Sequence, residues 1–222
     1  MVDHRKTVTI AAIAALTIVP LAACSNNDSS GPASTSTTTM AAPTPAAQID
    51  NLTGRATAVA LDPAFTDALT SLALTPGVVG TATLESGSVI FPITGGDVKY
   101  YTPGTVDPYV QGDIQHNGSG LSLAAGGTTA QLTNFDIDPG TSLLYGDVSV
   151  NGTPAATHAI LFDLDGRTLQ PLQSGPDNTA VLQGTRVLMS ADAAGLLNKT
   201  FNTEAVKQGL QVGTATITLN TK

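Results

Sequence analysis

Apolar and polar residues alternate with a period of two along much of the chain from about residue 50 to its end. In the segment 214–219, Ala215, Ile217 and Leu219 share one face and threonines occupy the other. The segment 55–61 alternates by side-chain size rather than polarity, and 88–93 is a short apolar run. Because successive side chains of a strand point to opposite faces, these patterns predict a series of β-strands.

Asparagine or aspartate followed by glycine separates several of these runs. Such a dipeptide suits a type I′ turn, in which both central residues take a positive φ. We predict β-hairpins at three of them: Asn117-Gly118, Asn151-Gly152 and Asp165-Gly166. The pairs Gly95-Gly96 and Gly126-Gly127 lack the strand–loop–helix context of a phosphate-binding loop, so they are interpreted as plain turns.

Two segments have helical spacing instead. Asp62-Pro63 is typical of a helix start, with Phe65, Leu69 and Leu72 following on one stripe. Ser190 precedes a second stripe that contains Leu197. Many short strands with two short helices predict a mainly β fold, an antiparallel β-sandwich or open barrel, as a single domain over residues 49–222.

The N-terminus has the pattern of a secretory signal. Arg5 and Lys6 precede the uncharged run 8–21, which is shorter than the about 20 residues needed to span a bilayer. The run ends in Leu21-Ala22-Ala23-Cys24, which resembles the lipobox of bacterial lipoproteins. The resemblance implies a signal peptide over 1–23, acylation of Cys24 with palmitate-type chains, and an extracytoplasmic, lipid-anchored location at the cell membrane. The alternative is an ordinary secretory signal with a chance Cys.

A tether is predicted between this anchor and the β-domain, over residues 24–48. Ser, Thr, Pro and Ala dominate it, and its only charge is Asp28. Such a composition buries too little apolar surface to offset the entropy of ordering. Either a plain linker or an O-glycosylated spacer fits this segment.

The negative net charge excludes some classes of binding partner. Nine Lys and Arg face 17 Asp and Glu, a formal net charge of −8. Loss of residues 1–23 removes Asp3, Arg5 and Lys6 and leaves a net charge of −9. Nucleic acid is therefore not expected as a partner, and anionic lipid headgroups would repel the domain, so the lipid itself must anchor it. A single Cys also excludes an intrachain disulfide and a Cys-rich zinc site.

Catalytic and metal motifs are not recognisable. There is no nucleophile elbow, and His116 and His158, the two histidines after the signal, are not spaced as zinc ligands. Asp136-x-Asp138 and Asp163-x-Asp165 have too few ligands for a calcium loop and are interpreted as turns. A hydrolase would need a Ser or Asp beside one of the histidines. His158, which shares a strand face with Ile160 and Phe162, is expected to be structural.

Aromatic residues gather before His116. Tyr100, Tyr101 and Tyr109 are three of the four tyrosines, and the stretch 112–123 places a Gly-rich segment after the histidine. This arrangement resembles the HtaA-type haem-binding domains of actinobacterial envelopes. The resemblance implies ferric haem held by a tyrosinate, with His116 as its hydrogen-bond partner. The chain lacks the family's Trp and has no Tyr in 62–74, so only His116 matches a family position. The alternative is that the tyrosines are ordinary strand residues.

Motifs spread over the domain are also similar to those of uncharacterised secreted or anchored bacterial proteins. They occupy 61–65, 74–76, 91–96, 120–128, 132–138 and 212–217. This resemblance implies a shared fold and supplies no activity. The sequence thus favours a non-enzymatic envelope lipoprotein, without a cofactor, whose β-domain binds an unknown ligand or protein. The alternatives are a haem-binding or haem-uptake protein and a hydrolase with an unrecognised site.

Overall fold

The computed structural model describes residues 42–221, which are rich in β-strands. The first strands are β1 (Ala47–Ile49), β2 (Arg55–Leu61), β3 (Thr75–Gly80), β4 (Thr83–Glu85), β5 (Ser88–Pro92) and β6 (Gly95–Tyr100). The later ones are β7 (Val110–Ala125), β8 (Thr128–Asp138), β9 (Leu143–Val150), β10 (Thr153–Asp165), β11 (Gln173–Gly175), β12 (Thr179–Met189) and β13 (Gln211–Asn220). The helices are α1 (Pro63–Ser71), α2 (Ala191–Phe201) and the 3₁₀ turn η1 (Gly166–Thr168).

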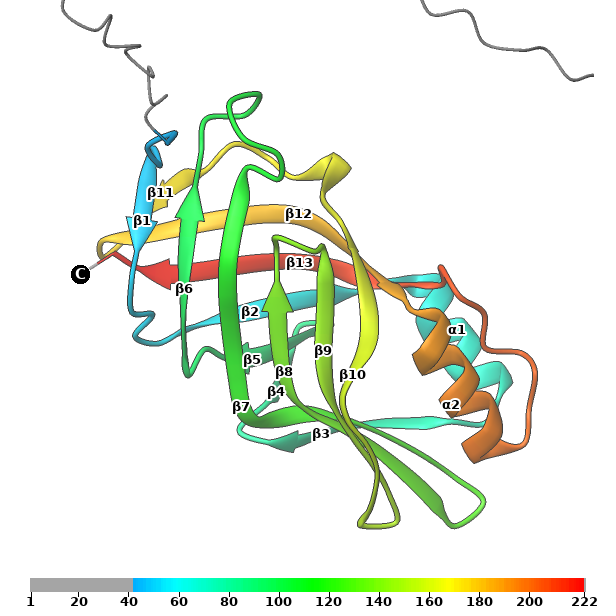
Figure 1. Ribbon diagram of the computed structural model, residues 1–222. Coiled ribbons are helices and arrows are strands. Elements are labelled where there is room, and N and C mark those ends of the chain that lie inside the picture. The colour runs from blue at the N-terminus through cyan, green and yellow to red at the C-terminus, as the bar shows by residue number, and fades with distance from the viewer. Residues whose placement is uncertain (1–41, 222) are drawn as a thin grey trace, which may run out of the picture. The chain divides into compact units, whose positions relative to one another are not determined.

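All strands belong to one antiparallel sheet that curls on itself. Its order is β1-β6-β7-β8-β9-β10-β12-β13-β2-β5-β4, with β3 added to β7 and β11 to β12. Figure 1 shows β6–β10 running across the direction of β12, β13, β2 and β5, so that the two halves of the sheet face each other. The outermost strands on the path, β1 and β4, do not pair with each other. The predicted mainly β class is confirmed, in its open-barrel form with two short helices.

The helix starts follow the predicted capping. Asp62 accepts a hydrogen bond from the Ala64 backbone N–H, with Pro63 at the first helical position of α1. Ser190 accepts from the Ala193 N–H at the start of α2. These caps satisfy backbone donors that lack partners within the helix. Both helices lie at one end of the curled sheet (Figure 1).

Only one of the three predicted hairpins is correct. Asn151-Gly152 connects β9 to β10 with both residues at positive φ. Asn117-Gly118 instead lies within the continuous strand β7, at a shift in its register with β8, and Gly126-Gly127 makes the turn after it. Asp165-Gly166 starts η1 rather than a hairpin, because the Asp165 carboxylate caps that turn. Asn-Gly accommodates a positive φ in a bulge as well as in a turn, so the dipeptide alone does not separate the two.

Bulges on neighbouring strands curve the wall formed by β8, β9 and β10. Asn134 on β8 and His158 on β10 both have a positive φ, at +54° and +46°. The Asp147 carboxylate on β9 joins them, because it accepts from the Asn134 amide at 2.8 Å and from the His158 backbone N–H at 3.0 Å. Bulges increase the local twist of a sheet, so these contacts fix the bend of the wall.

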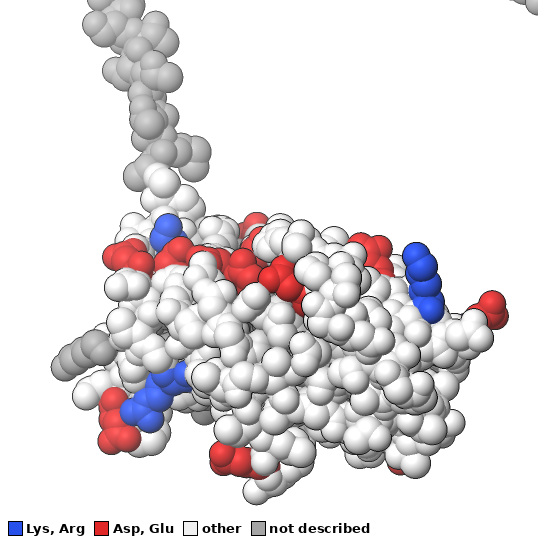
Figure 2. Space-filling model, turned by 90° about the horizontal axis from the view of Figure 1, so that it is seen from below, with Lys and Arg blue, Asp and Glu red and all other residues white. Residues whose placement is uncertain are grey.

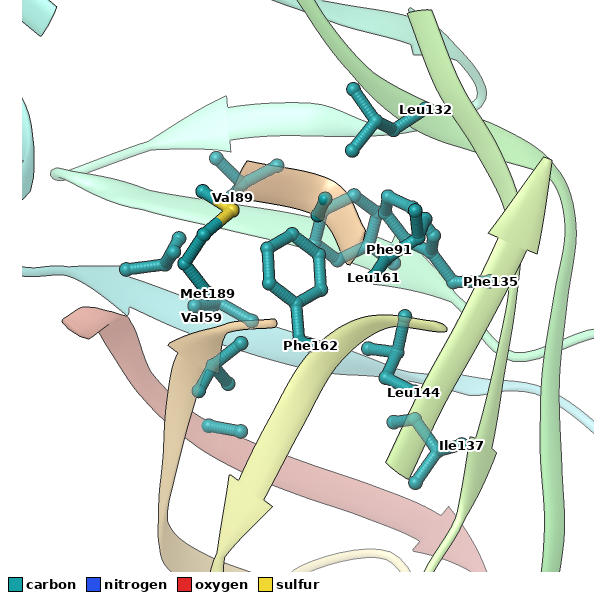
Figure 3. Packing of buried hydrophobic residues seen from close by; sticks show 14 of the residues in the cluster. Val59, Val89, Phe91, Leu132, Phe135, Ile137, Leu144, Leu161, Phe162 and Met189 are labelled. Carbon is teal, nitrogen blue, oxygen red and sulfur yellow. The ribbon is translucent and has the colours of Figure 1, made fainter. Parts of the chain in front are cut away.

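The core fills part of the space between the two halves of the sheet. Phe162 on β10 lies in the middle of a cluster that includes Val59, Phe91, Phe135 and other residues (Figure 3). The Phe91 and Phe135 rings, from opposite halves, meet edge to face with centroids 5.1 Å apart. Aromatic pairs of this geometry add to the stability gained by burial.

The N-terminal boundary differs slightly from the predicted position. Ala47 and Gln48, at the end of the predicted tether, form β1 together with Ile49 and pair with β6. Cys24, the signal peptide and most of the tether lie outside the described residues. Within residues 42–221, no helix is long and apolar enough to cross a membrane.

Candidate functional site

A cavity of about 650 Å³ lies between the two halves of the sheet. Strands β2 and β5 line it on one side, for example with Val59 and Phe91, and β7–β10 line it on the other, for example with Ile114 and Leu144. Strands β12 and β13 contribute Val187 and other apolar residues. The lining is therefore mostly aliphatic and aromatic, as is typical of a site for a hydrophobic ligand.

Residues of three loops line the same cavity at one end of the barrel. They are Asp107–Tyr109 between β6 and β7, Pro139 and Ser142 between β8 and β9, and Asp165–Arg167 at the end of β10. Antiparallel register brings the start of β7, the end of β8, the start of β9 and the end of β10 to this one end. These loops carry most of the polar groups of the lining, so we call this end the mouth.

His116 lies in the interior, with 1% of its surface exposed. Its Nδ1 lies 3.3 Å from the Phe135 carbonyl oxygen, which can only accept, so Nδ1 carries the hydrogen. Nε2 then accepts from the Thr57 hydroxyl at 2.8 Å, a contact that joins β7 to β2 across the interior. Burial lowers the pKa of His116 to about 4, so the imidazole is neutral at pH 7.

The predicted tyrosines separate in the structure. Tyr109 lines the cavity together with His116. Tyr100 packs edge-on against Tyr109, with ring centroids 5.8 Å apart, and neither Tyr100 nor Tyr101 belongs to the lining. The Tyr101 backbone N–H donates to the Tyr109 carbonyl at 2.7 Å and so closes the loop. Burial, and then the neighbouring Tyr100, raise the pKa of Tyr109, which keeps the phenol protonated.

An ion cluster at the mouth was not predicted. Arg167 donates from Nε and Nη2 to the Asp165 carboxylate at 2.7–3.1 Å, and Arg186 on β12 contacts the same carboxylate. These guanidinium groups, with Arg167 making the larger contribution, hold the pKa of Asp165 well below its usual range. The sequence Asp165-Gly166-Arg167 could have indicated the local ion pair. The contact of Arg186 with Asp165 could not be predicted, because it depends on the register of β10 with β12.

A second cavity of about 200 Å³ lies beside the first, next to the helices. Phe65 of α1 and Leu197 of α2 line it, as do Val78 and Leu84, two large apolar side chains that are exposed to solvent. Its lining contains no Tyr or His. Five residues line both cavities and so form a shared wall: Leu61, Val89, Leu121, Phe162 and Val212.

The histidines do not form a recognisable catalytic set. The His116 ring contacts a threonine hydroxyl and a backbone carbonyl, and no carboxylate orients it in the described part of the chain. His158 does not share the buried face of Phe162 as expected. Its bulged backbone turns it outward, where its ring stacks on Tyr145 with centroids 4.5 Å apart. Among residues 42–221, no group of three His, Cys, Asp or Glu side chains is placed to hold a metal ion.

Of the acidic side chains in the described residues, only Asp107 and Asp165 line the cavity. Figure 2 shows acidic side chains gathered in a band on the face seen from below, where Lys and Arg are few. Asp97 on β6 and Asp113 on β7 are register partners in the sheet. Burial, and then the nearby Asp113, raise the pKa of Asp136 on β8. The chain's negative charge is therefore concentrated outside the apolar cavity.

Comparison with known proteins shows the fold and leaves the ligand open. No family model matches the chain, and no curated protein matches its sequence. The structure is similar to the C-terminal domain of HtaA from Corynebacterium glutamicum, with 13% identity, a TM-score of 0.52, and coverage of 76% of this chain and 97% of that domain. It also has a weaker similarity to the haem-binding protein HtaB of the same organism, with 9% identity, a TM-score of 0.48, and coverage of 78% and 96%.

Proposed function

We propose that this protein binds a hydrophobic ligand in its large cavity and is held at the outside of the cell membrane by lipid on Cys24. The observation that carries the proposal is an apolar cavity of about 650 Å³ within a single folded domain. Protein interiors are packed nearly as densely as organic crystals, with few voids larger than a water molecule. A space within the range of about 300–1,000 Å³ found for ligand sites therefore supports binding.

The interior chemistry supports binding rather than catalysis. The buried polar side chains that line the cavity, Thr57 and His116, hydrogen-bond to each other across it. Their polar atoms are thus satisfied before any ligand arrives, and the remaining wall offers mainly dispersion contacts and area removed from water. We therefore propose a carrier or receptor for its ligand and not an enzyme.

A neutral fluorescent probe, N-phenyl-1-naphthylamine, tests this function. The residues from Ala42 onward form a compact unit with its own core, so the probe is titrated into that unit. Ala215 is a small buried residue of the lining, and Ala215→Phe fills the cavity. The matched control is Ala60→Phe, at an exposed position of the adjacent strand β2.

We expect saturable binding that Ala215→Phe weakens at least tenfold and Ala60→Phe leaves unchanged, with both variants showing native far-UV circular dichroism. Absence of saturable binding to the wild type would refute the proposed function. Equal binding by both variants would place the probe outside the cavity and refute the assigned site.

Haem is a second candidate ligand, favoured because Tyr109 and His116 line the same cavity. A phenolate suits ferric iron, so Tyr109 would hold the metal and the apolar wall would enclose the porphyrin. The resemblance of the sequence to HtaA-type domains supports the same candidate. The raised pKa of Tyr109 opposes it, and so do the two hydrogen bonds that already engage His116, which would first have to release Thr57 or Phe135.

Titration with ferric haem tests the candidate. One-to-one binding with a charge-transfer band that Tyr109→Phe abolishes and His116→Ala weakens is the expected result for haem. Tyr100→Phe and Tyr101→Phe are the matched controls, because their rings lie outside the lining. Absence of the band, or its indifference to Tyr109→Phe, would remove Tyr109-held haem as a candidate.

The anchor is tested separately on the full chain. We expect the intact mass of the membrane-extracted protein to show cleavage before Cys24 and attached acyl chains. Cys24→Ser should abolish both and release the chain from the membrane. Cleavage without added lipid would instead indicate an ordinary secretory signal.

A further inference from the structure

We infer that the ligand of the large cavity is a hydrophobic molecule that carries a carboxylate, and that Arg167 receives this carboxylate at the mouth. The inference rests on the proposed hydrophobic binding and adds the chemical class of the ligand. It starts from the position of one basic residue. The described chain contains six Lys and Arg, and Arg167 alone among them lines the cavity.

The backbone and side chain of Arg167 are both held at the mouth. Its backbone N–H donates to Asp165 Oδ1 at 3.0 Å in the cap of η1, and its Nε and Nη2 form a fork on the same carboxylate. The side chain nevertheless remains 81% exposed. The guanidinium is thus held in place and is also accessible to solvent. Its Nη1 makes no hydrogen bond to Asp165 and can donate to a ligand. A pre-positioned donor loses less entropy when it binds an anion.

The positive charge of Arg167 is not cancelled by its partner. Asp165 also contacts Arg186, whose side chain is 34% exposed, so two guanidinium groups share one carboxylate. The cluster has one formal positive charge left over. Asp107, in the loop between β6 and β7, also lines the mouth and balances this charge overall, but no ion pair among the described residues joins it to Arg167 or Arg186. The net charge of the chain, −8, opposes an anionic ligand at long range, so the local contact with the exposed guanidinium of Arg167 has to supply the attraction.

The apolar interior of the cavity and the guanidinium at its mouth together favour an amphipathic ligand. The interior is lined by residues such as Leu182, Val187 and Ile217 and would enclose the apolar part. An arginine donates hydrogen bonds to a carboxylate in a charge-assisted geometry that a neutral hydroxyl or ester does not reproduce. Either a long-chain fatty acid or a porphyrin with propionate groups supplies this chemistry, and the experiment separates these two sources.

The experiment measures displacement of N-phenyl-1-naphthylamine by matched ligands. Palmitate is compared with hexadecanol, and haemin with its dimethyl ester, on the wild type, Arg167→Gln and Arg167→Lys. The control is Lys199→Gln, a charge removed from α2 at a position that does not line the cavity. Each acid and its neutral analogue share the apolar part, so their ratio isolates the carboxylate.

We expect at least one acid to bind about tenfold more tightly than its neutral analogue, as one charge-assisted hydrogen-bonded contact provides. Arg167→Gln should remove this preference, Arg167→Lys should restore part of it, and Lys199→Gln should leave it intact. The acid that shows the preference identifies the source of the carboxylate.

Two other results have distinct meanings. If the neutral probe binds and Arg167→Gln leaves every ratio of acid to neutral analogue unchanged, the carboxylate inference is wrong while the proposed function stands. If the neutral probe itself does not bind the wild type, the proposed function fails and this inference fails with it.

Discussion

On strand β7, His116 lies inside the barrel, and Asp113, three residues earlier, lies on the opposite face. The inner residue is neutral at pH 7, fully buried, and hydrogen-bonded through both ring nitrogens. The outer residue is a carboxylate whose register partner on β6, Asp97, is another carboxylate. Asp136 on the next strand has a buried Oδ1 without a hydrogen-bond partner among the described residues. On the inner face of this sheet the polar group is neutral and hydrogen-bonded, whereas on the outer face carboxylates lie next to one another.

The difference follows from the dielectric environment of each face. Inside, an unpaired polar group or charge costs free energy that only a nearby partner offsets, so the wall there is apolar or satisfied. Outside, water and salt screen carboxylates where they are exposed, so the sheet tolerates their repulsion, and the partly buried Asp136 responds with a raised pKa. The inner face consequently presents mainly apolar area, and the charged side chains of the cavity lining all lie at the mouth.

Replacing one aromatic residue on each face of the wall should give the largest contrast. Phe162, 4% exposed and central in the core, should lose about 3–5 kcal/mol of unfolding free energy when changed to Ala. Tyr145→Ala on the outer face removes the stack on His158 from a half-buried ring and should cost about 1 kcal/mol. Urea unfolding measures both values, and equal losses would show that the two faces are not energetically distinct.

Lowering the pH should reduce the free energy of unfolding, because His116 on the inner face is held in its neutral form. Its pKa is about 4 in the folded state and about 6.5 when unfolded, so between these values the unfolded chain binds more protons. Stability therefore falls as the pH drops from 6.5 to 4, by about 3 kcal/mol for this residue. Unfolding at pH 7.5, 5.5 and 4.5 should show a smaller fall in His116→Gln than in the wild type. Parallel curves would assign the pH dependence to other groups.

Asp136 on the outer face should give a pH dependence of stability opposite to that of His116, and the smallest of the three effects. Because the pKa of Asp136 is raised in the fold, its favourable contribution is present below its unfolded pKa and is lost as the pH rises through the folded value. Asp136→Asn should therefore stabilise the protein at pH 7 by about 0.5 kcal/mol, and added salt should reduce only the part of this effect that comes from repulsion by Asp113. Asp67→Asn, at an exposed position on α1, is the matched control. Destabilisation by Asp136→Asn alone would show that the carboxylate has a favourable role.

Local signals in the sequence were sufficient for much of the fold. The alternation over 214–219 became part of β13, and Asp62 and Ser190 cap the helices as predicted, since these features depend on neighbours within a few residues. The Asn117-Gly118 prediction failed because β7 continues through that dipeptide and gains β3 as a partner beyond it. The chain contains that partner some forty residues earlier, and no local pattern indicates the pairing.

The candidate site was only partly predictable. His116 and Tyr109 drew attention because His and Tyr are rare in the chain, and both line the cavity. Tyr100 and Tyr101 share the sequence neighbourhood but not the lining. Arg186 reaches Asp165 only because β10 and β12 are in register, and the cavity itself depends on what the packed side chains leave empty. Such features follow from tertiary structure and have no signature in a linear pattern.

The pairing of β1 sets where the domain is attached. Ala47 lies opposite Tyr100, the last residue of β6, and the Ala46 N–H donates to the Tyr100 carbonyl. The loop that follows Tyr100 carries Asp107 and Tyr109 at the mouth. The polypeptide therefore joins the domain at the same end as the mouth, with the hairpin turns that follow β7 and β9 at the far end (Figure 1). A force applied at the N-terminus would therefore reach the domain through β1 and β6, next to the loop that carries Asp107 and Tyr109.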